Sequence, residues 1–569
     1  MRKDMTIGAV GAGGDGVMVL GSLLQYLTAS RGYFSQMPRF YGAQIRGGAS
    51  AVKLGLNAGT LSLPKDVMDI LVCFNWEKYL EFKQELPFDE HTIVFYEKDA
   101  PKGITLPARS FRIPFSERSE RVTGSPLSKN IVALGLLARA LGLASHRRAE
   151  LVRESEELTI LSENLAAFED GGSLLLEAPL SELELVSAMP IIPKVVLHGN
   201  EAIARAAIYA GCQAFFGYPI TPESEIMEYL AQELPKKNSV FLQAEDEIAS
   251  AGLALGASLV GVKAMTATSG PGFDLMTEMM GLAAADEIPL VIIDVQRGGP
   301  STGMPSKSEQ SDLSHALYGG HGDAPRVVLA PYDLEGCYRL TIESFNIAEY
   351  YQALVILLSD QWLGQTLVAT NDDFLRRNYP IIERKRPAAD STNNYLRYQL
   401  TPDFISPMAD VGAEGFVYQT TGLTHNENGT PSFDVETSQL FHEKIWRKLL
   451  PLTERDDLCK IFGNPLSTKG IMTWGSSAQA VLAAVKDLGL EDEVRVCIPE
   501  LICPLPDKVK KFLESTERLL IVEMNYSGQF HNYLRSQVGL PKKTMVYKRA
   551  GGRPFTSLEL SEPLSEALK

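Results

Sequence analysis

Three residues in the middle of the sequence have side chains suited to binding and protonating an anionic ligand. Thr221 lies between Pro219 and Pro222, which fix the backbone of this turn and so hold the hydroxyl in one direction. Glu247 leads a stretch rich in alanine and glycine, where a buried carboxyl could contact a protonated ring nitrogen. Arg297 follows an apolar run and stands among small residues, where its guanidinium could pair with a carboxylate through two hydrogen bonds.

Each of these segments also has a purely structural interpretation. Thr221-Pro222 could simply cap the next helix, because proline is favoured in a first helical turn. An acid at the start of a helix, such as Glu247, usually balances the helix dipole. Arg297 could satisfy loop carbonyls. Taken singly, the motifs leave both interpretations open.

Two glycine-containing loops could also contact a ligand. Residues 266–273 combine hydroxyl groups with the free backbone N–H groups of a helix start, so Ser269 and Gly270 are candidate ligand contacts. Residues 41–50 place Gln44 and Arg46 beside Gly47, a set that could clamp an anion or form a plain turn.

The glycine run 11–16 fits the GxGxxG pattern of a dinucleotide-binding turn. That interpretation also requires an acidic residue about 20 positions on, and residues 31–36 (Arg-Gly-Tyr-Phe-Ser-Gln) contain none. The same run contains Gly-Asp-Gly, the start of a thiamine diphosphate motif, but the first asparagine after it is Asn57, too distant for that loop. If the chain uses thiamine diphosphate, another polypeptide must hold the diphosphate.

Composition excludes several classes of protein. The 569-residue chain has a net charge of -16, which argues against nonspecific binding to nucleic acid. No apolar run approaches the roughly 20 residues of a membrane span, and the glycines and Asp15 within residues 2–29 disfavour a signal peptide. The six cysteines form no CxxC pair, so we expect no metal site in this chain and a reducing cytoplasm.

The hydrophobic pattern predicts an α/β protein with three α/β domains. Short apolar strands alternate with helices throughout, and the middle part fits a doubly wound sheet. The predicted divisions are a first domain over 1–187, a second over 194–365, a connector over 366–440 and a third domain over 441–569.

Taken together, the motifs resemble the 2-oxoacid:ferredoxin oxidoreductase family, specifically its fused gamma–alpha subunits of the 2-oxoglutarate type. The match extends over nearly the whole chain. The first domain resembles the gamma part, although Asp15 stands where the family usually has glutamine. The second resembles the thiamine-diphosphate pyrimidine-binding domain, and the third the transketolase C-terminal-like domain. The stretches that carry the resemblance are 11–16, 46–48, 218–222, 247, 268–272, 297–305, 474–476 and 523–529.

The resemblance implies specific roles for these residues. Glu247 would hydrogen-bond the aminopyrimidine ring of thiamine diphosphate, beside Tyr218, Pro219, Ile220, Ser269 and Gly270. Thr221 would orient the 2-oxoacid, and Arg297 would hold its C1 carboxylate. Gln44, Arg46 and Gly47 would lie near coenzyme A or the distal end of the substrate. Run in reverse, the same site would carboxylate an acyl-CoA.

The resemblance further implies an obligate beta subunit, which would hold Mg²⁺ and a [4Fe-4S] cluster and pass electrons to ferredoxin. The expected assembly is a dimer of heterodimers. Three alternatives remain: a pyruvate or branched-chain 2-oxoacid enzyme, a non-catalytic paralogue, and an NAD-linked oxidoreductase built on residues 11–16.

Overall fold

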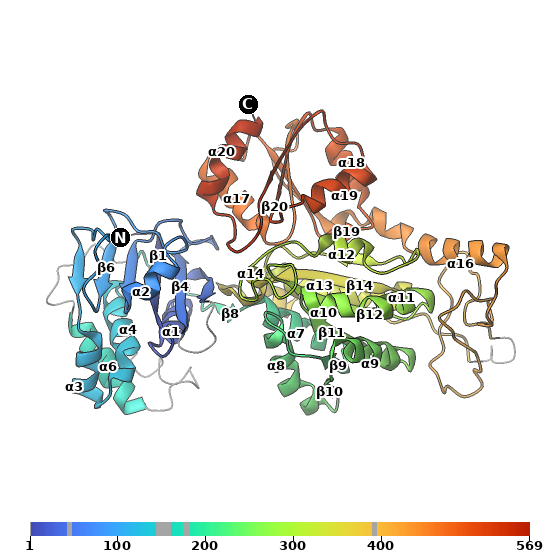
Figure 1. The fold of residues 1–569 in the computed structure, drawn as a ribbon, viewed down its shortest axis with the longest axis horizontal. Helices are drawn as coiled ribbons and strands as arrows, with labels where there is room; N and C mark the ends of the chain where they lie inside the picture. The colour runs from blue at the N-terminus through green and yellow to red at the C-terminus, as the bar shows by residue number, and fades with distance from the viewer. Residues whose placement is uncertain are drawn as a thin grey trace. The chain divides into compact units, whose positions relative to one another are not determined.

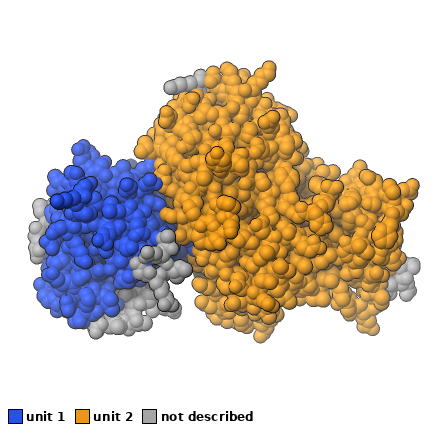
Figure 2. All heavy atoms as spheres, viewed as in Figure 1, with its two compact units in different colours: residues 1–198, 365–373 blue, residues 199–364, 374–569 orange. Residues whose placement is uncertain are grey.

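The computed structural model describes residues 2–42, 48–143, 161–174, 183, 185–389 and 395–568. The chain forms two compact units (Figure 2). Unit 1 contains residues 1–198 and 365–373, and unit 2 contains residues 199–364 and 374–569. The predicted α/β class is confirmed, because helices alternate with the strands of three sheets (Figure 1).

Unit 1 is built on one mixed sheet of nine strands, in the order β7-β6-β5-β1-β4-β2-β15-β8 with β3 paired to β4. Its apolar helices bury one face each against the sheet, and α1 and α4 contribute most of their aliphatic side chains to the core. The strands are β1 (Asp4–Ala12), β2 (Phe34–Met37), β3 (Arg39–Tyr41), β4 (Ala49–Asn57), β5 (Ile70–Cys73), β6 (Ile93–Tyr96), β7 (Ser110–Arg112), β8 (Val195–Leu197) and β15 (Leu367–Thr370). The helices are α1 (Val17–Ser30), α2 (Trp76–Glu81), α3 (Phe115–Thr123), α4 (Lys129–Ala140) and α6 (Leu161–Ser173).

The glycine run between β1 and α1 is a turn closed by its own acidic side chain. The Asp15 carboxylate accepts a hydrogen bond of 2.7 Å from the Ala12 N–H and forms a 2.8 Å ion pair with Lys129. Gly16 adopts φ 73°, a conformation that glycine tolerates without steric cost. The negative charge at this helix start is therefore supplied by the protein itself.

Unit 2 contains a sheet of seven strands in the order β10-β9-β11-β12-β14-β13-β19. All neighbouring strands are parallel except β13 and β19. Parallel sheets are covered on both faces, which explains why β11, β12 and β14 are buried along their whole length. The strands are β9 (Ala214–Gly217), β10 (Val240–Gln243), β11 (Ala264–Thr268), β12 (Leu290–Gln296), β13 (Val327–Leu329), β14 (Leu354–Asp360) and β19 (Leu501–Cys503). The helices are α7 (Gly199–Tyr209), α8 (Ser224–Glu233), α9 (Glu247–Leu259), α10 (Gly270–Leu275), α11 (Thr277–Ala285), α12 (Leu313–Tyr318), α13 (Leu334–Tyr351), α14 (Gln361–Gln365) and α15 (Asp373–Arg376).

The C-terminal part of unit 2 adds a five-stranded sheet in the order β16-β18-β17-β20-β21. One hydrophobic core joins it to the seven-stranded sheet, with Trp474 and Phe530 packed into the same cluster as Phe273 and Leu313. The strands are β16 (Cys459–Gly463), β17 (Lys469–Thr473), β18 (Arg495–Pro499), β20 (Arg518–Glu523) and β21 (Lys543–Lys548). The helices are α16 (Val435–Arg447), α17 (Ser477–Asp487), α18 (Asp507–Glu514), α19 (Gln529–Gln537) and α20 (Ser557–Leu568). None of the helices in the described residues has the length and apolar content that a bilayer span requires.

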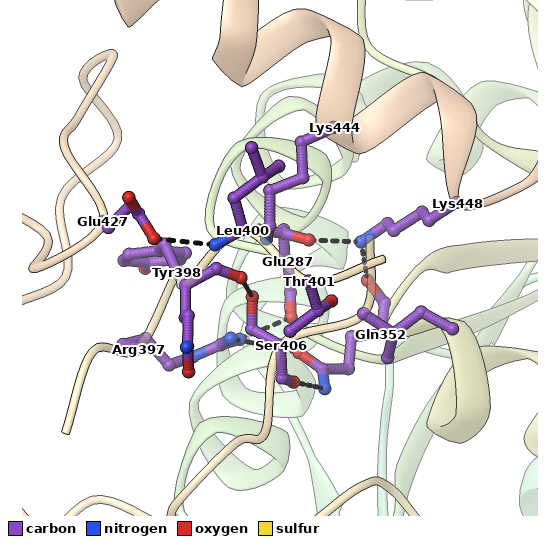
Figure 3. Close-up of polar contacts among 12 residues, drawn as sticks. Glu287, Gln352, Arg397, Tyr398, Leu400, Thr401, Ser406, Glu427, Lys444 and Lys448 are labelled. Carbon is purple, nitrogen blue, oxygen red and sulfur yellow. Dashed lines mark hydrogen bonds and ion pairs between the residues drawn. The ribbon is translucent and has the colours of Figure 1, made fainter. Parts of the chain in front are cut away.

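A buried cluster of charges anchors the connector to the seven-stranded sheet (Figure 3). Glu287, which lies between α11 and β12, forms ion pairs with Lys444 and Lys448 of the α16 region, the second at 2.8 Å. Arg397 donates to the Glu287 carbonyl at 2.8 Å and to the Gln352 side chain at 3.0 Å. The cluster thus ties Arg397 of the connector and the end of α16 to two loops of the sheet.

The same cluster holds a strained backbone. Glu287 and Gln352 have φ 51° and φ 48°, which costs a non-glycine residue about 1–3 kcal/mol. Burial alone would raise the pKa of Glu287, but Lys444 and Lys448 outweigh burial and lower the pKa below its usual value. The resulting stabilisation is present above the pKa of an unfolded glutamate and is lost as the pH falls below it.

We predict that Glu287→Gln lowers the free energy of unfolding by about 3–5 kcal/mol, because it leaves two buried lysines without a counter-ion. Urea titration at neutral pH measures this change. The matched control is Glu443→Gln, which removes the partly exposed Glu443–Arg447 pair on α16 and should cost about 1 kcal/mol or less. Equal effects of the two substitutions would contradict the proposed role of the cluster.

Candidate functional site

The predicted ligand residues of unit 2 follow neighbouring parallel strands at the same edge of the sheet. The strand order β10-β9-β11-β12 places the chain reversal between β9 and β11. Open α/β sheets bind ligands in the crevice at such a switch point, outside the carboxyl ends of the strands. The loops after these strands carry Thr221, Glu247, Ser269 and Arg297.

The loop after β9 is linked directly to the loop after β12. The Thr221 carbonyl accepts a 2.6 Å hydrogen bond from Nη1 of Arg297, a side chain that is only 7% exposed. The Thr221–Pro222 peptide bond is cis. Tyr218, Pro219 and Thr221 are exposed and Ile220 is half-buried, so this loop presents its surface to an incoming group.

Glu247 begins α9 with its carboxylate directed over the start of α10. The side chain of Asp246 caps the helix by accepting from the Ala249 N–H at 2.8 Å, so Glu247 is not needed as the cap. A Cβ at Gly272 would lie 2.3 Å from both Glu247 Oε1 and Thr268 Oγ1, so these two groups meet above a position that only glycine allows.

The Glu247 carboxylate has no hydrogen-bond donor among the residues that the structure describes, although the residue is only 6% exposed. Its neighbours leave the carboxylate available to a group from outside the chain. This geometry suits a contact with a protonated or N–H-bearing ring.

A second carboxyl group close to Glu247, at Glu223, was not predicted from the sequence. Glu223 is fully buried, and neither carboxyl oxygen has a hydrogen-bond partner in the described chain. Burial raises the pKa of Glu223 well above its usual value, and the negative charges of Glu225, Glu228 and Glu247 raise it further. Burial therefore disfavours a negative charge on Glu223 beside Glu247. In the sequence, the signal that could have identified Glu223 is its position directly after Pro222.

Arg297 borders a cavity of about 540 Å³ between the seven-stranded sheet and the C-terminal sheet. Gly270, Asp312 and His315 line it from one side, and Asn525 and Tyr526 line it from the other. The cavity is large enough for a small dicarboxylate. Ser269 lies just outside it, fully buried, with its hydroxyl unpartnered.

The C-terminal motifs, residues 474–476 and 523–529, lie around the side chain of Gln310. Gln310 donates to the Trp474 carbonyl at 2.8 Å, and its side-chain oxygen accepts from Ser477 at 2.7 Å and from the Met524 N–H at 3.0 Å. Gly475, with φ 55°, makes room for the Gln310 amide. These contacts fix the wall of the cavity formed by residues 525–529.

The structure thus brings Thr221 and Arg297 into contact, and it places Glu247 with Ser269 and Gly270 on the neighbouring loops. Gln44, Arg46 and Gly47 lie outside the described residues. Among the described residues, no group of three or more histidine, cysteine, aspartate or glutamate side chains is arranged to hold a metal ion.

Comparison with protein families gives two matches along the chain. Residues 205–441 match the model described as "Pyruvate flavodoxin/ferredoxin oxidoreductase, thiamine diP-bdg", and residues 6–174 match "Pyruvate ferredoxin/flavodoxin oxidoreductase". The first match contains Thr221, Glu247, Ser269 and Arg297, which form the site described above.

Individual proteins are similar to this chain over its full length. The chain is 30% identical to the 2-oxoacid:ferredoxin oxidoreductase subunit alpha of a Sulfolobus species, over 100% of this chain and 97% of the relative. It is 37% identical to the 2-oxoglutarate synthase subunit KorA of Methanothermobacter marburgensis, over 62% of this chain and 94% of the relative. A solved structure, the 2-oxoglutarate:ferredoxin oxidoreductase of Magnetococcus marinus with 2-oxoglutarate, coenzyme A and succinyl-CoA bound, has a TM-score of 0.92 and 33% identity, with 100% of both chains covered.

We predict that Gly272→Ala displaces the Glu247 carboxylate and lowers the thermal unfolding midpoint, because the added methyl group would lie 2.3 Å from Oε1 of Glu247 and 2.3 Å from Oγ1 of buried Thr268. A crystal structure of the variant and its thermal unfolding midpoint measure both effects. Gly256→Ala on α9 is the matched control, since its Cβ would meet no atom within 4 Å. This control should be stabilised by about 0.5–1 kcal/mol. An unmoved Glu247 carboxylate in Gly272→Ala would refute the crowding argument.

Proposed function

Because the chain belongs to the 2-oxoacid:ferredoxin oxidoreductase family, we propose that it is the fused gamma–alpha subunit of a 2-oxoglutarate:ferredoxin oxidoreductase. The reaction converts 2-oxoglutarate and coenzyme A to succinyl-CoA and CO₂, and two electrons reduce ferredoxin. The names of two similar proteins support 2-oxoglutarate as the substrate: the Magnetococcus enzyme with this compound bound and the 2-oxoglutarate synthase subunit.

The observation that carries the proposal is Glu247, which is 6% exposed at the switch point of the sheet and whose carboxylate has no hydrogen-bond donor among the described residues. Thiamine diphosphate, when bound, supplies the carbon nucleophile and the electron sink that decarboxylation of a 2-oxoacid requires. Glu247 would hold a proton at the aminopyrimidine ring, and the burial that raises the pKa of Glu223 would limit the negative charge beside that contact. Tyr218, Pro219, Ile220, Ser269 and Gly270 would surround the ring.

Arg297 and Thr221 would position the substrate. The Arg297 guanidinium uses Nη1 to bind the Thr221 carbonyl, which fixes its direction and leaves the rest of its N–H groups for the C1 carboxylate of the 2-oxoacid. The distal carboxylate of 2-oxoglutarate would need a second cation or donor cluster, supplied by Arg46, Gln44 or the partner subunit. Gly47, in the same loop, would let the backbone approach the distal end of the substrate or coenzyme A.

The remaining parts of the enzyme belong to an obligate beta subunit. It would grip the diphosphate of the cofactor through Mg²⁺ and would carry the [4Fe-4S] cluster that reduces ferredoxin one electron at a time. The six cysteines of this chain are scattered over separate elements, and five of them are buried, which fits a structural role. We propose a dimer of such heterodimers, located in the cytoplasm.

We predict that the co-purified complex reduces a viologen dye in a reaction that depends on thiamine diphosphate and coenzyme A, with a higher kcat/KM for 2-oxoglutarate than for pyruvate or branched-chain 2-oxoacids. Glu247→Gln should lower kcat by about 10²–10⁴-fold, because the proton contact with the ring is lost. Glu245→Gln, a substitution at the exposed neighbour, is the matched control and should keep normal turnover.

Two results would overturn this proposal. Full activity of the Glu247→Gln complex would assign the proton contact elsewhere and revive the non-catalytic alternative. A preference for pyruvate or a branched-chain 2-oxoacid would keep the chemistry but change the substrate.

We predict that Arg297→Lys lowers kcat/KM by about 10–100-fold, because lysine cannot reproduce a bidentate bond to a carboxylate. The loss should be equal for 2-oxoglutarate and for pyruvate, since both have a C1 carboxylate. Steady-state assays of the complex on both substrates measure it. A loss confined to 2-oxoglutarate would instead place Arg297 at the distal carboxylate.

A further inference from the structure

A second cavity, of about 340 Å³, lies beside the buried charge cluster of the connector (Figure 3). Its apolar walls are formed by four side chains, those of Leu396, Leu400, Leu440 and Phe441. Glu427 and Lys444 contribute opposite charges to the lining. This cavity shares no lining residue with the 540 Å³ cavity at Arg297, so the two are separate spaces within unit 2.

Lys444 uses only part of its hydrogen-bonding capacity within the chain. Its side chain is buried, and its ammonium group forms an ion pair with Oε1 of Glu287. An ammonium group has three N–H donors, and Glu287 is the one acceptor for them among the described residues. Two donors therefore remain for an acceptor in the cavity that Lys444 lines.

The buried charges next to this cavity contain more cations than carboxyl groups. Three cations are buried in the cluster, those of Arg397, Lys444 and Lys448. Two carboxyl groups, those of Asp286 and Glu287, are buried with them. Burial lowers the pKa of both lysines, that of Lys448 to about 8, although Glu287 opposes this effect. Buried charges are normally paired, so the imbalance favours an anionic group in the cavity.

Glu427 presents a carboxylate to the same cavity. The residue is exposed, and Oε2 accepts the Leu400 N–H at 2.7 Å, which fixes the direction of the side chain (Figure 3). Oε1 has no partner in the part of the chain that the structure describes, and Glu427 forms no ion pair with Lys444 there. Since a carboxylate accepts several hydrogen bonds, Glu427 retains the capacity to bind a cationic group.

One wall of the cavity is formed by packed rings. The Tyr398 and His425 rings lie with their centroids 3.8 Å apart, and the Phe441 ring meets His425 edge-on at 5.1 Å. The two nitrogens of His425 lie 3.1 Å from the Asn426 carbonyl and 3.3 Å from the Ala285 carbonyl. This wall is therefore in place before a ligand arrives, which lowers the entropic cost of binding.

We propose that this cavity binds a free amino acid with an apolar side chain. The ligand carboxylate accepts hydrogen bonds from Lys444, its ammonium group donates to Glu427, and its side chain lies against the leucine and phenylalanine walls. The volume is at the lower end of the range for small-molecule sites, which suits one amino acid better than a peptide or a nucleotide. The site lies apart from Arg297 and takes no part in the 2-oxoacid chemistry proposed there.

Isothermal titration calorimetry of the co-purified complex tests this site with three probes. L-Leucine carries both charges, isocaproate lacks the ammonium group, and isoamylamine lacks the carboxylate. Leucine should bind about tenfold or more tighter than either analogue, because each lost charge removes a charge-assisted hydrogen bond. Equal affinities of leucine and isocaproate would contradict the role of Glu427, and the absence of leucine binding would overturn the site.

Glu427→Gln tests the ammonium contact. An amide oxygen still accepts the Leu400 N–H, so the side chain keeps its direction but loses its charge. The affinity for leucine should fall by about tenfold or more, whereas the affinity for isocaproate should stay the same. Glu436→Gln is the matched control, because Glu436 is exposed on α16 and does not line the cavity, and it should leave leucine binding unchanged.

Lys444→Met tests the carboxylate contact and should weaken the binding of both leucine and isocaproate. Lys448 still pairs with Glu287 at 2.8 Å in this variant, and its thermal unfolding midpoint shows whether it is folded. If it is not folded, Glu427→Gln decides. Arg297→Lys should leave leucine binding unchanged, and a loss of binding there would place leucine in the 540 Å³ cavity and overturn the site. Calorimetry needs no turnover, so its result is independent of the proposed function.

Discussion

The site depends on the close approach of Glu247 to the start of α10. Only a glycine at position 272 leaves space for the Glu247 carboxylate and the Thr268 hydroxyl together. Asp246 caps the N-terminus of this helix, so the Glu247 side chain is not needed as a cap. A carboxylate in this position is nearly buried, but it is still available to a group from outside the chain.

Unit 2 buries carboxyl groups in two different environments. At Glu287, two lysines and an arginine compensate one carboxylate, and the result is a fixed ionic anchor beneath strained backbone. At Glu223, Asp294 and Asp312, burial is not compensated in this way, and it raises the pKa of each carboxyl group above its usual value. The first arrangement stabilises the connector.

The fold was predicted well because its signals are local. Short apolar strands alternate with helices, as the hydrophobic pattern predicted, and a turn follows β1 at the glycine run 11–16. The ordered set of motifs identified the family, which the comparisons confirm. The glycine run at 11–16 was ambiguous in the sequence, since it fitted several ligand motifs. The structure shows that Asp15 fills this turn with the protein's own carboxylate.

The sequence by itself determined the α/β class, the family and the candidate residues Thr221, Glu247 and Arg297. Only the tertiary structure decided that Arg297 is directed by the Thr221 carbonyl, that Gln310 holds the C-terminal motifs, and that β15 completes the sheet of unit 1. It also revealed the buried carboxyl oxygens of Glu223, Asp294 and Asp312 that have no hydrogen-bond partner in the described residues. The physical reason is that these features are contacts and burial between segments far apart in the chain, whereas periodicity and turn chemistry report only on neighbouring residues.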